Sequence, residues 1–331
     1  MNKKRTDGEF GITDLPGVGE VSIKKLNSAG VTTIFDICIR GSMELNEISG
    51  ISQPDARDIV TLAWKRLEEM KLCRPKQMDT MDMYDFRETL IKIPTMSINI
   101  DYILKGGFEL EAVTELYGEY GSGKTQMCNV AAIEAIEKHD FNVLWLDCED
   151  TFRPERILEI AISRGYVKDK EEGKAKYFHK ITYIHAPNTD ELINTLDNLT
   201  PLMLEKKFKL IVVDGSIGQF RAEYLGRGTL SVRQNNLSRF MEHLKNVSYF
   251  FRCAVIMTNQ VQSDPTASQF HMDPIKPIGG NVVGHASTYR IYLVKRGSKR
   301  FMRMVDSPKD GIEDKEYILD VAGVSDPKEK K

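Results

Sequence analysis

The sequence has little cysteine and lacks long apolar runs. Its five cysteines are odd in number and no two have the spacing Cys-x-x-Cys, which disfavours a disulfide framework and a zinc site and indicates a reducing compartment. No apolar run approaches the roughly 20 residues of a membrane-spanning helix. Residues 1–10 also lack the apolar stretch of a signal peptide. We therefore expect a cytoplasmic protein that does not engage a membrane.

A strong excess of charge of one sign is missing too. The 331 residues carry a formal net charge of −2, with 41% hydrophobic and 28% charged residues, a composition typical of globular proteins. A chain of this length is expected to form about two domains. A polyanion such as DNA must be bound by a local basic patch, because the chain as a whole does not attract it.

Residues 1–72 are predicted to form a small all-α domain. The run LPGVG at residues 15–19 precedes a helical stretch that carries Lys24 and Lys25. A proline followed by two glycines favours a tight turn that opens onto a helix. This pattern is typical of a helix–hairpin–helix, in which free main-chain N–H groups hold a DNA phosphate. The alternative is a purely structural turn.

Two further regions follow. Residues 73–96 contain Pro75 and Pro94 without clear periodicity, so we interpret them as a linker with a short interaction segment.

In residues 97–331, apolar runs alternate with helical stretches, which predicts an α/β domain with a mostly parallel sheet covered on both faces. The predicted strands are 112–117, 142–147, 181–185, 209–214 and 254–259, with antiparallel strands added at one edge by residues 288–320. The predicted helices are 126–138, 153–164, 190–205 and 232–246.

A phosphate-binding loop is the clearest motif of the chain. The residues that fit the pattern GxxxxGK[ST] are Gly118, Glu119, Tyr120, Gly121, Ser122, Gly123, Lys124 and Thr125. The glycines let the main chain curl with its N–H groups toward phosphates, the lysine reaches the β- and γ-phosphates, and the threonine hydroxyl binds Mg²⁺. A strand before the motif and a helix after it favour this function over a glycine-rich structural loop. We therefore predict that the chain binds ATP with Mg²⁺.

Acidic residues end two of the predicted strands. Asp214 closes a buried apolar run and is predicted to hold Mg²⁺ through water, although many parallel strands end in Asp for structural reasons. Glu149 follows another run and is the candidate base that activates water for hydrolysis. Two alternatives remain at this stage: Asp147 is the base, or Glu149 forms a structural ion pair with Arg153 or Arg156.

Polar and basic residues after other strands suggest two further roles. Gln260 lies at the carboxyl end of its strand, where it either senses the γ-phosphate in the ligand crevice or caps the strand. The segment after Asp214 contains the arginines Arg221, Arg227, Arg233 and Arg239. Arginine forks suit phosphates, and Tyr224 offers an aromatic face for a base. The glycines at 218, 226 and 228 are typical of a mobile loop, and the alternative is a solvated helix face.

Together these motifs resemble the archaeal RadA recombinases and their eukaryotic counterparts. The segments that carry the resemblance are EDTFRPER (149–156), FRAEY (220–224), GRG (226–228), TNQV (258–261), PIGG (277–280) and GHAST (284–288). The resemblance extends from the turn near residue 15 to about residue 322. It implies a RecA-like P-loop ATPase core joined to a helix–hairpin–helix domain. It also implies a DNA-dependent ATPase that forms filaments on single-stranded DNA and pairs it with homologous duplex.

The resemblance also implies roles for single residues and for partners. Glu149 would activate water, Lys124 and Gln260 would act on the γ-phosphate, and Arg156 would stack on adenine. His285, Asp306 and Pro308 would reach ATP across a subunit boundary. The first DNA-binding loop would contain Arg221, Tyr224, Arg227 and Arg233, and the second would span 261–280 and end at Gly280. The implied partners are single- and double-stranded DNA, further copies of the chain in a filament or ring, and recombination mediators, in a nucleoid-associated setting.

The sequence departs from that family at two places. The family's Phe-x-x-Ala polymerisation segment is replaced in the linker by QMDTM at 77–81. In one register Met78 would fill the neighbour's pocket, and the larger Met81 would clash in place of alanine. The second departure is Gly215, where serine is usual, which leaves the metal site short of one hydroxyl unless Ser216 supplies it.

Two other functions compete with a strand-exchange recombinase. A non-exchanging relative that acts as an ATP-controlled DNA-binding mediator is favoured by the altered linker. A small-molecule P-loop kinase would need neither the N-terminal domain nor the arginine-rich segment. The complete phosphate-binding loop, Glu149 and both predicted loops favour the recombinase.

Overall fold

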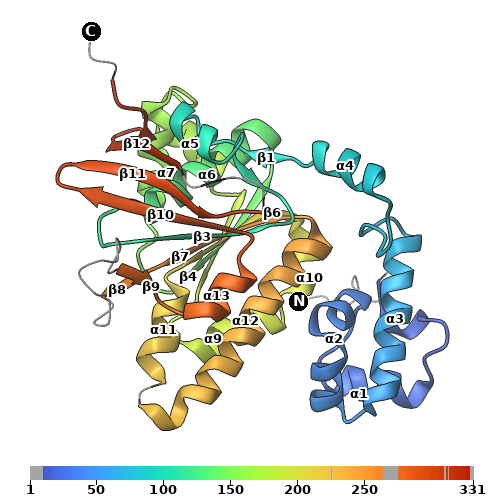
Figure 1. The fold of residues 1–331 in the computed structure, drawn as a ribbon. Helices are drawn as coiled ribbons and strands as arrows, with labels where there is room; N and C mark the ends of the chain where they lie inside the picture. The colour runs from blue at the N-terminus through green and yellow to red at the C-terminus, as the bar shows by residue number, and fades with distance from the viewer. Residues whose placement is uncertain (1–9, 225, 264–274, 309–310, 312, 329–331) are drawn as a thin grey trace.

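A nine-stranded sheet lies at the centre of the computed structural model, which describes residues 10–224, 226–263, 275–308, 311 and 313–328. The strand order is β13-β12-β11-β10-β3-β7-β6-β4-β5 (Figure 1). The strands are β3 (Val113–Gly118), β4 (Asn142–Asp147), β5 (Ile181–His185), β6 (Phe208–Asp214), β7 (Ala254–Asn259), β10 (Tyr289–Arg296), β11 (Lys299–Asp306), β12 (Glu313–Asp320) and β13 (Gly323–Ser325). The first six strands run parallel, and β11, β12 and β13 continue the sheet in antiparallel pairs. The predicted α/β fold with a mostly parallel sheet is confirmed, and so is its antiparallel edge, although β10 itself pairs parallel with β3.

The central strands are apolar on both faces because helices cover both. In β4, Val143 and Trp145 point into one hydrophobic cluster, whereas Leu144 and Leu146 point into the other, as the alternation of a strand requires. One face is covered by α5 (Ile98–Ile103), α6 (Lys124–His139), α7 (Pro154–Ser163) and α8 (Lys170–Tyr177). The other is covered by α9 (Thr189–Asp197), α10 (Thr200–Lys206), α11 (Ser216–Glu223), α12 (Leu230–Phe251) and α13 (Gly280–Ala286). Each fully buried aliphatic or aromatic side chain contributes about 1.5–3 kcal/mol.

The predicted helix 190–205 is wrong in one respect, since this stretch forms two helices, α9 and α10. Helix α9 ends at its C-cap Asn198, and Pro201 lies in the first turn of α10, where a missing N–H removes no helical hydrogen bond. The sequence pattern did not predict α8, α11 or α13. Among the described helices, none combines the length and the apolar character that crossing a bilayer requires.

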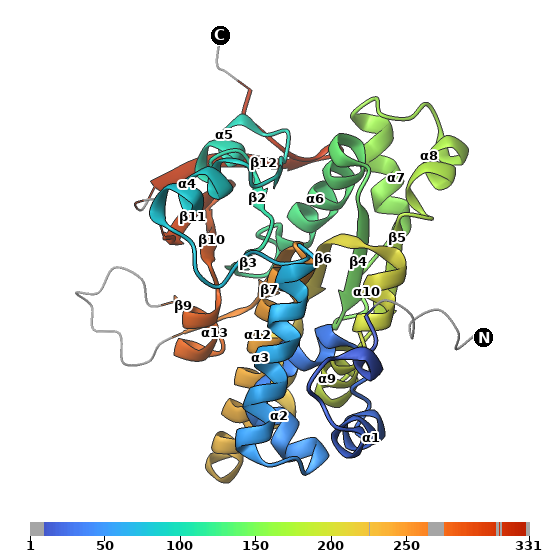
Figure 2. The ribbon, with the colours of Figure 1, turned by 90° about the vertical axis from the view of Figure 1, so that its right-hand side faces the viewer.

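The N-terminal part consists of η1 (Ile12–Asp14), α1 (Glu20–Ser28), α2 (Ile34–Ser49) and α3 (Gln53–Glu69). Figure 2 shows α1, α2 and α3 gathered at one end of the molecule, beside α9 and α12. The ring of Phe35 stacks on Phe251 at 4.7 Å, and Trp64 packs edge-on against Phe250 at 4.9 Å. These helices share one hydrophobic cluster with α12, so the domain boundary at residue 72 stays a prediction.

A charged cluster joins the N-terminal helices to the core. Glu44 on α2 accepts hydrogen bonds from Arg40 (2.6 Å), from Arg239 (2.9 Å) and from His243 (2.8 Å). Asp197 at the end of α9 accepts from Arg239 at 2.8 Å and lies 3.2 Å from the other ring nitrogen of His243. Arg239, interpreted from the sequence as part of a DNA-binding segment, is instead engaged in this cluster.

The linker is more ordered than its sequence indicates. It contains α4 (Thr80–Glu88), whose N-cap Asp79 accepts from the N–H of Asp82 at 2.8 Å, and β1 (Lys92–Ile93), which pairs with β2 (Phe108–Glu109). No residue of α4 is buried, and the side chain of Met81 is 69% exposed. The linker therefore presents a helix with an apolar residue to solvent.

Candidate active site at the carboxyl edge of the sheet

The loop between β3 and α6 has the geometry of an anion site. Gly121 and Gly123 adopt positive φ values of 73° and 106°, which glycine tolerates without strain. A Cβ at Gly118 would lie 2.5 Å from the carbonyl oxygen of Leu293, so only glycine fits there. Helix α6 begins at Lys124 without a side-chain cap, and its first N–H groups are available to a phosphate. The hydroxyl of Ser122 is buried without a protein partner, which also fits a polar ligand.

The antiparallel edge strands brace this loop. The Tyr317 hydroxyl on β12 donates to the carbonyl of Ser122 at 2.5 Å, and Arg300 on β11 donates to the carbonyl of Gly121 at 3.2 Å. Leu319 packs against Gly123, where an added Cβ would lie 2.9 Å from it. Sequence reasoning missed these braces because their strands are far from the motif in the chain.

Two residues of the motif differ in exposure. The Lys124 ammonium donates to the carbonyls of Gly118 (2.9 Å) and Glu119 (3.1 Å). Burial lowers the pKa of Lys124, and the carboxylates of Glu149 and Asp214 act in the opposite direction. Tyr120, in contrast, is 99% exposed, so its ring projects from the loop.

A hydroxyl and a carboxylate meet where Mg²⁺ is predicted. The Thr125 hydroxyl at the start of α6 donates to Asp214 at 2.9 Å, and the Thr258 hydroxyl at the end of β7 donates to the other oxygen of Asp214 at 2.5 Å. Burial raises the pKa of Asp214, against the hydrogen bonds from Thr258 and Thr125. Oxygen donors of this kind are the ligands that Mg²⁺ prefers, so the donor set fits the predicted metal. The Thr258 hydroxyl lies beside Asp214, and the Ser216 hydroxyl is buried without a described hydrogen-bond partner. Whether Ser216 supplies the missing hydroxyl to the metal stays a prediction.

Glu149 and Gln260 come together although their strands are not adjacent. The Gln260 amide donates to the Glu149 carboxylate at 2.8 Å. Asp147 accepts from the main-chain N–H groups of Glu149 (3.1 Å) and Phe152 (2.8 Å), so both of its oxygens stabilise the turn after β4. Arg153 donates to main-chain carbonyls of that same turn. This arrangement favours Glu149 over Asp147 as the carboxylate available to a reacting water.

Arg156 contacts α6, the helix that follows the phosphate loop. Its guanidinium donates to the Gln126 side chain at 2.8 Å, to the carbonyl of Asp320 at 2.7 Å and to the carbonyl of Val321 at 3.1 Å. It also pairs with Glu159 at 3.1 Å. These hydrogen bonds hold the Arg156 guanidinium between Gln126 on α6 and the turn that joins β12 to β13.

Three predicted DNA-binding residues line one open cavity of about 340 Å³. Arg221 comes from α11, Arg233 from α12 and Gly280 from the start of α13. Tyr224 instead accepts a hydrogen bond from Asn236 at 2.7 Å and packs against the core. The main chain of Arg227 forms part of η2 (Arg227–Thr229), while its side chain lies outside the described structure.

Described helices and strands occupy part of both predicted DNA-binding loops. In the glycine-containing segment after Asp214, most residues belong to α11 and α12. Helix α11 begins two residues after Asp214, at Ser216. The second segment begins with β8 (Val261–Ser263) and ends with β9 (Ile275–Pro277), which pair antiparallel. Pro265, Phe270 and Pro274 lie outside the described residues.

Three residues predicted to reach a neighbouring subunit are exposed in the single chain. His285 lies in the last turn of α13, Asp306 ends β11, and Pro308 follows it. Their roles toward another subunit stay predictions.

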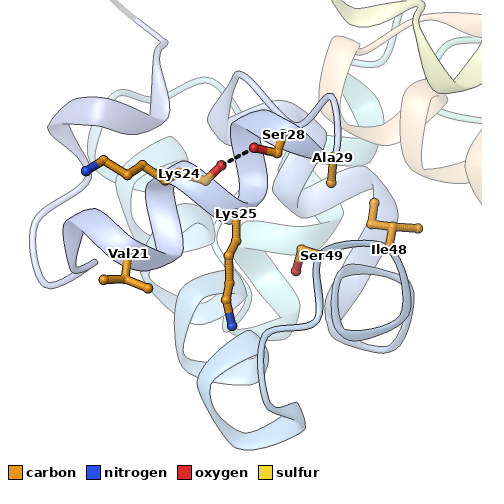
Figure 3. Close-up of a pocket in the computed structure, with 7 residues that line it drawn as sticks. All are labelled: Val21, Lys24, Lys25, Ser28, Ala29, Ile48 and Ser49. Carbon is orange, nitrogen blue, oxygen red and sulfur yellow. Dashed lines mark hydrogen bonds between the residues drawn. The ribbon is translucent and has the colours of Figure 1, made fainter.

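The hairpin near residue 15 leads into α1, which carries two lysines. Gly17 has a φ of 88°, and Gly19 is the N-cap of α1. Figure 3 shows Lys24 and Lys25 projecting in different directions beside Val21, at a pocket of about 380 Å³. The Lys25 ammonium donates to the carbonyl of Gly50 at 3.1 Å.

A parallel sheet with a phosphate loop after β3, an acid at the end of β6 and a carboxylate after β4 defines a RecA-like P-loop protein. The Rad51 family profile matches residues 86–327. A DNA repair and recombination protein RadA of Cenarchaeum symbiosum is 39% identical over 326 residues, covering 97% of this chain and 80% of its own length. A protein of the same name from Aeropyrum pernix is 36% identical over 323 residues, covering 96% of this chain and 97% of its own length. The chain belongs to the Rad51 family.

Proposed function

We propose that the chain is an ATP-dependent DNA strand-exchange recombinase. One observation carries the proposal: the candidate hydrolytic site and the arginine-lined cavity share a segment. Gln260 contacts Glu149 at 2.8 Å, and Gln262, two residues further on, lines the cavity with Arg221 and Arg233. DNA bound in the cavity and ATP bound at the loop therefore act on the same short stretch of chain.

A second connection runs through α11. The side-chain amide of Gln219 donates to the carbonyl of Cys148 at 3.0 Å and to that of Ala186 at 2.7 Å. Cys148 directly precedes Glu149, and Arg221 follows Gln219 by two residues. A movement of α11 on DNA binding would reach the turn that holds Glu149.

At the nucleotide site each residue has a distinct role in this proposal. The N–H groups of the loop and Lys124 bind the phosphates, and the fixed guanidinium of Arg156 stacks on adenine. Thr125 and Asp214 hold Mg²⁺, which neutralises developing negative charge on the phosphates when bound. Glu149 accepts a proton from the attacking water, and Gln260 orients the Glu149 carboxylate.

At the DNA side, Arg221 and Arg233 bind backbone phosphates with forked hydrogen bonds. Arg227 would add a third phosphate contact from η2, and Gly280 allows the backbone of DNA to approach α13 closely. Tyr224 would need to leave its hydrogen bond with Asn236 to stack on a base. Lys24 and the N-terminus of α1 would hold duplex DNA.

Self-association is part of the proposal, in a filament or ring in which His285, Asp306 and Pro308 face a neighbour's ATP. Negative-stain imaging with an ATP analogue and single-stranded DNA tests it, and filaments or rings are expected. A cytoplasmic, nucleoid-associated location follows from this function.

The second candidate function is an ATP-controlled mediator that loads another recombinase. The exposed Met81 on α4 favours it, because the linker differs from the segment expected for polymerisation. ATP hydrolysis measured with and without single-stranded DNA, together with a strand-exchange assay, distinguishes the two. The recombinase is expected to hydrolyse ATP faster with DNA and to exchange strands, whereas a mediator would bind DNA without exchange.

A further inference from the structure

Gly215 occupies a constrained position directly after Asp214. Its φ is 88°, and it is the N-cap residue of α11. A left-handed backbone alone would explain a glycine here. The space around its α-carbon indicates a second reason.

A side chain at this position would collide with the proposed catalytic carboxylate. A Cβ built on Gly215 would lie 2.3 Å from Cγ, 2.6 Å from Cδ and 2.8 Å from Oε1 of Glu149. Carbon atoms in contact are normally about 3.5–4.0 Å apart. The carboxylate of Glu149 therefore rests directly on the main chain of Gly215.

Neither main chain can easily withdraw from this contact. The N–H of Gly215 donates to the Thr258 hydroxyl at 2.9 Å, and that hydroxyl donates to Asp214 at 2.5 Å. The N–H of Cys148 donates to the carbonyl of Asp214 at 2.9 Å. Both stretches are tied to Asp214, so a larger residue at 215 must displace the Glu149 side chain.

That displacement has a defined direction. Gln260 donates to the Oε1 atom of Glu149, and the same atom lies 2.8 Å from the Cβ position of residue 215. Bulk at 215 would push this oxygen out of its present place and disturb its hydrogen bond with Gln260. The described hydrogen bonds of the Lys124 and Thr125 side chains involve neither Glu149 nor Gln260, so we expect phosphate binding to persist.

This chain has glycine where the family usually has serine, and the space left there is occupied by the Glu149 carboxylate. We propose that Gly215 is a positioning residue that sets the place of the Glu149 carboxylate in this chain for ATP hydrolysis. The inference rests on the proposed role of Glu149. It predicts that a methyl group at 215 slows turnover without weakening ATP binding.

The test compares Gly215→Ala with Gly165→Ala. Gly165 also has a positive φ of 74°, but a Cβ there would meet no atom within 4 Å, so it reproduces the backbone strain alone. For Gly215→Ala we expect kcat for DNA-stimulated ATP hydrolysis to fall at least about tenfold, because general-base catalysis contributes about 10²–10⁴-fold. Its KM for ATP should stay within about twofold, and Gly165→Ala should retain both parameters. If the wild-type chain is active and the two variants have equal kcat values, the inference about Gly215 is overturned while the proposed function stands.

A second variant keeps the test decisive if Gly215→Ala folds poorly. Glu149→Ala removes the atoms that the new methyl group meets. If Gly215→Ala lowers the melting temperature more than Gly165→Ala does, the double variant Glu149→Ala with Gly215→Ala should recover that extra loss. It should also hydrolyse ATP no more slowly than Glu149→Ala alone, because both changes act on one group. A double variant as unstable as Gly215→Ala would contradict the collision. A wild-type chain without DNA-stimulated hydrolysis would instead remove the proposed function on which the inference rests.

Discussion

The side-chain amide of Gln260 donates a hydrogen bond to the carboxylate of Glu149 across 2.8 Å. The two residues follow β7 and β4, which are separated in the sheet by β6. The hydrogen bond therefore crosses above the strand end that holds Asp214. It links the proposed base to the segment that continues into the arginine-lined cavity.

Gln260→Ala is expected to uncouple ATP hydrolysis from DNA. The variant loses the only described side-chain hydrogen bond that joins Glu149 to the segment before Gln262. Stimulation of ATPase activity by single-stranded DNA should therefore fall about tenfold or more, with the about 10²–10⁴-fold of a positioned acid–base group as the upper range. Steady-state rates with and without DNA measure this ratio. Gln53→Ala on α3 is the matched control and should keep full stimulation. Normal stimulation in Gln260→Ala would contradict the coupling role.

Glu149→Gln is expected to bind ATP and hydrolyse it slowly. The amide has nearly the same shape but cannot accept a proton from water, so kcat should fall by about 10²–10⁴-fold. Binding of a fluorescent ATP analogue should be unchanged. Glu155→Gln, an exposed change in the first turn of α7, should have no effect on turnover. Full activity of Glu149→Gln would exclude Glu149 as the base.

Arg221→Ala is expected to weaken single-stranded DNA binding equally for all sequences. A lost phosphate contact should reduce the slope of log affinity against log salt concentration by about 0.7 for a single strand. Fluorescence anisotropy at several salt concentrations measures the slope, with Arg57→Ala on α3 as a control of equal charge change. Selective loss for some base compositions would indicate a base contact instead.

The Glu44–His243–Asp197 cluster predicts a pH-dependent stability. Burial of His243 lowers its pKa, but its contacts with Asp197 and Glu44 outweigh this, so the pKa of His243 is raised above 6.5. A raised pKa means that stabilisation by protonated His243 is full below pH 6.5 and is lost as pH rises through the folded value. The pKa values of Glu44 and Asp197 are lowered, despite burial, mainly by their hydrogen bonds with His243. Their contribution is therefore present above 4.5 for Glu44 and 3.8 for Asp197, and is lost as pH falls through their folded values.

His243→Gln isolates this effect. Its destabilisation relative to wild type, measured by urea unfolding, should be greater near pH 5.5 than near pH 8.5. At the lower pH it should approach the about 1.5–3 kcal/mol of a hydrogen bond to a charged group. His179→Gln, remote from the cluster, serves as the control for loss of a histidine. The same loss at both pH values would show that folding does not raise the pKa of His243.

Much of the core could be predicted from sequence because its patterns are local. The strands β4, β5 and β7 have the predicted bounds. In β4 and β7, continuous apolar runs ending in polar residues leave little freedom at a buried parallel sheet. The phosphate loop followed from the spacing of its glycines, Lys124 and Thr125. These features depend on residues close together in the chain.

The remaining features depend on contacts across the fold. Thr258 stands beside Asp214 only because β7 and β6 are neighbours, and the crowding around Gly215 comes from a side chain 66 positions earlier, at Glu149. Arg239 was placed in a DNA-binding segment because its neighbours are arginines, but packing of α2 against α12 pairs it with Glu44. Periodicity alone contains no information on such partners.

A strand-exchange assay with the purified chain, single-stranded DNA, homologous duplex, ATP and Mg²⁺ tests the proposed function most directly. The recombinase should form heteroduplex product, and Lys124→Ala should form none because it cannot hold the phosphates. Tight DNA binding by the wild-type chain without any heteroduplex product would contradict the recombinase and favour the mediator.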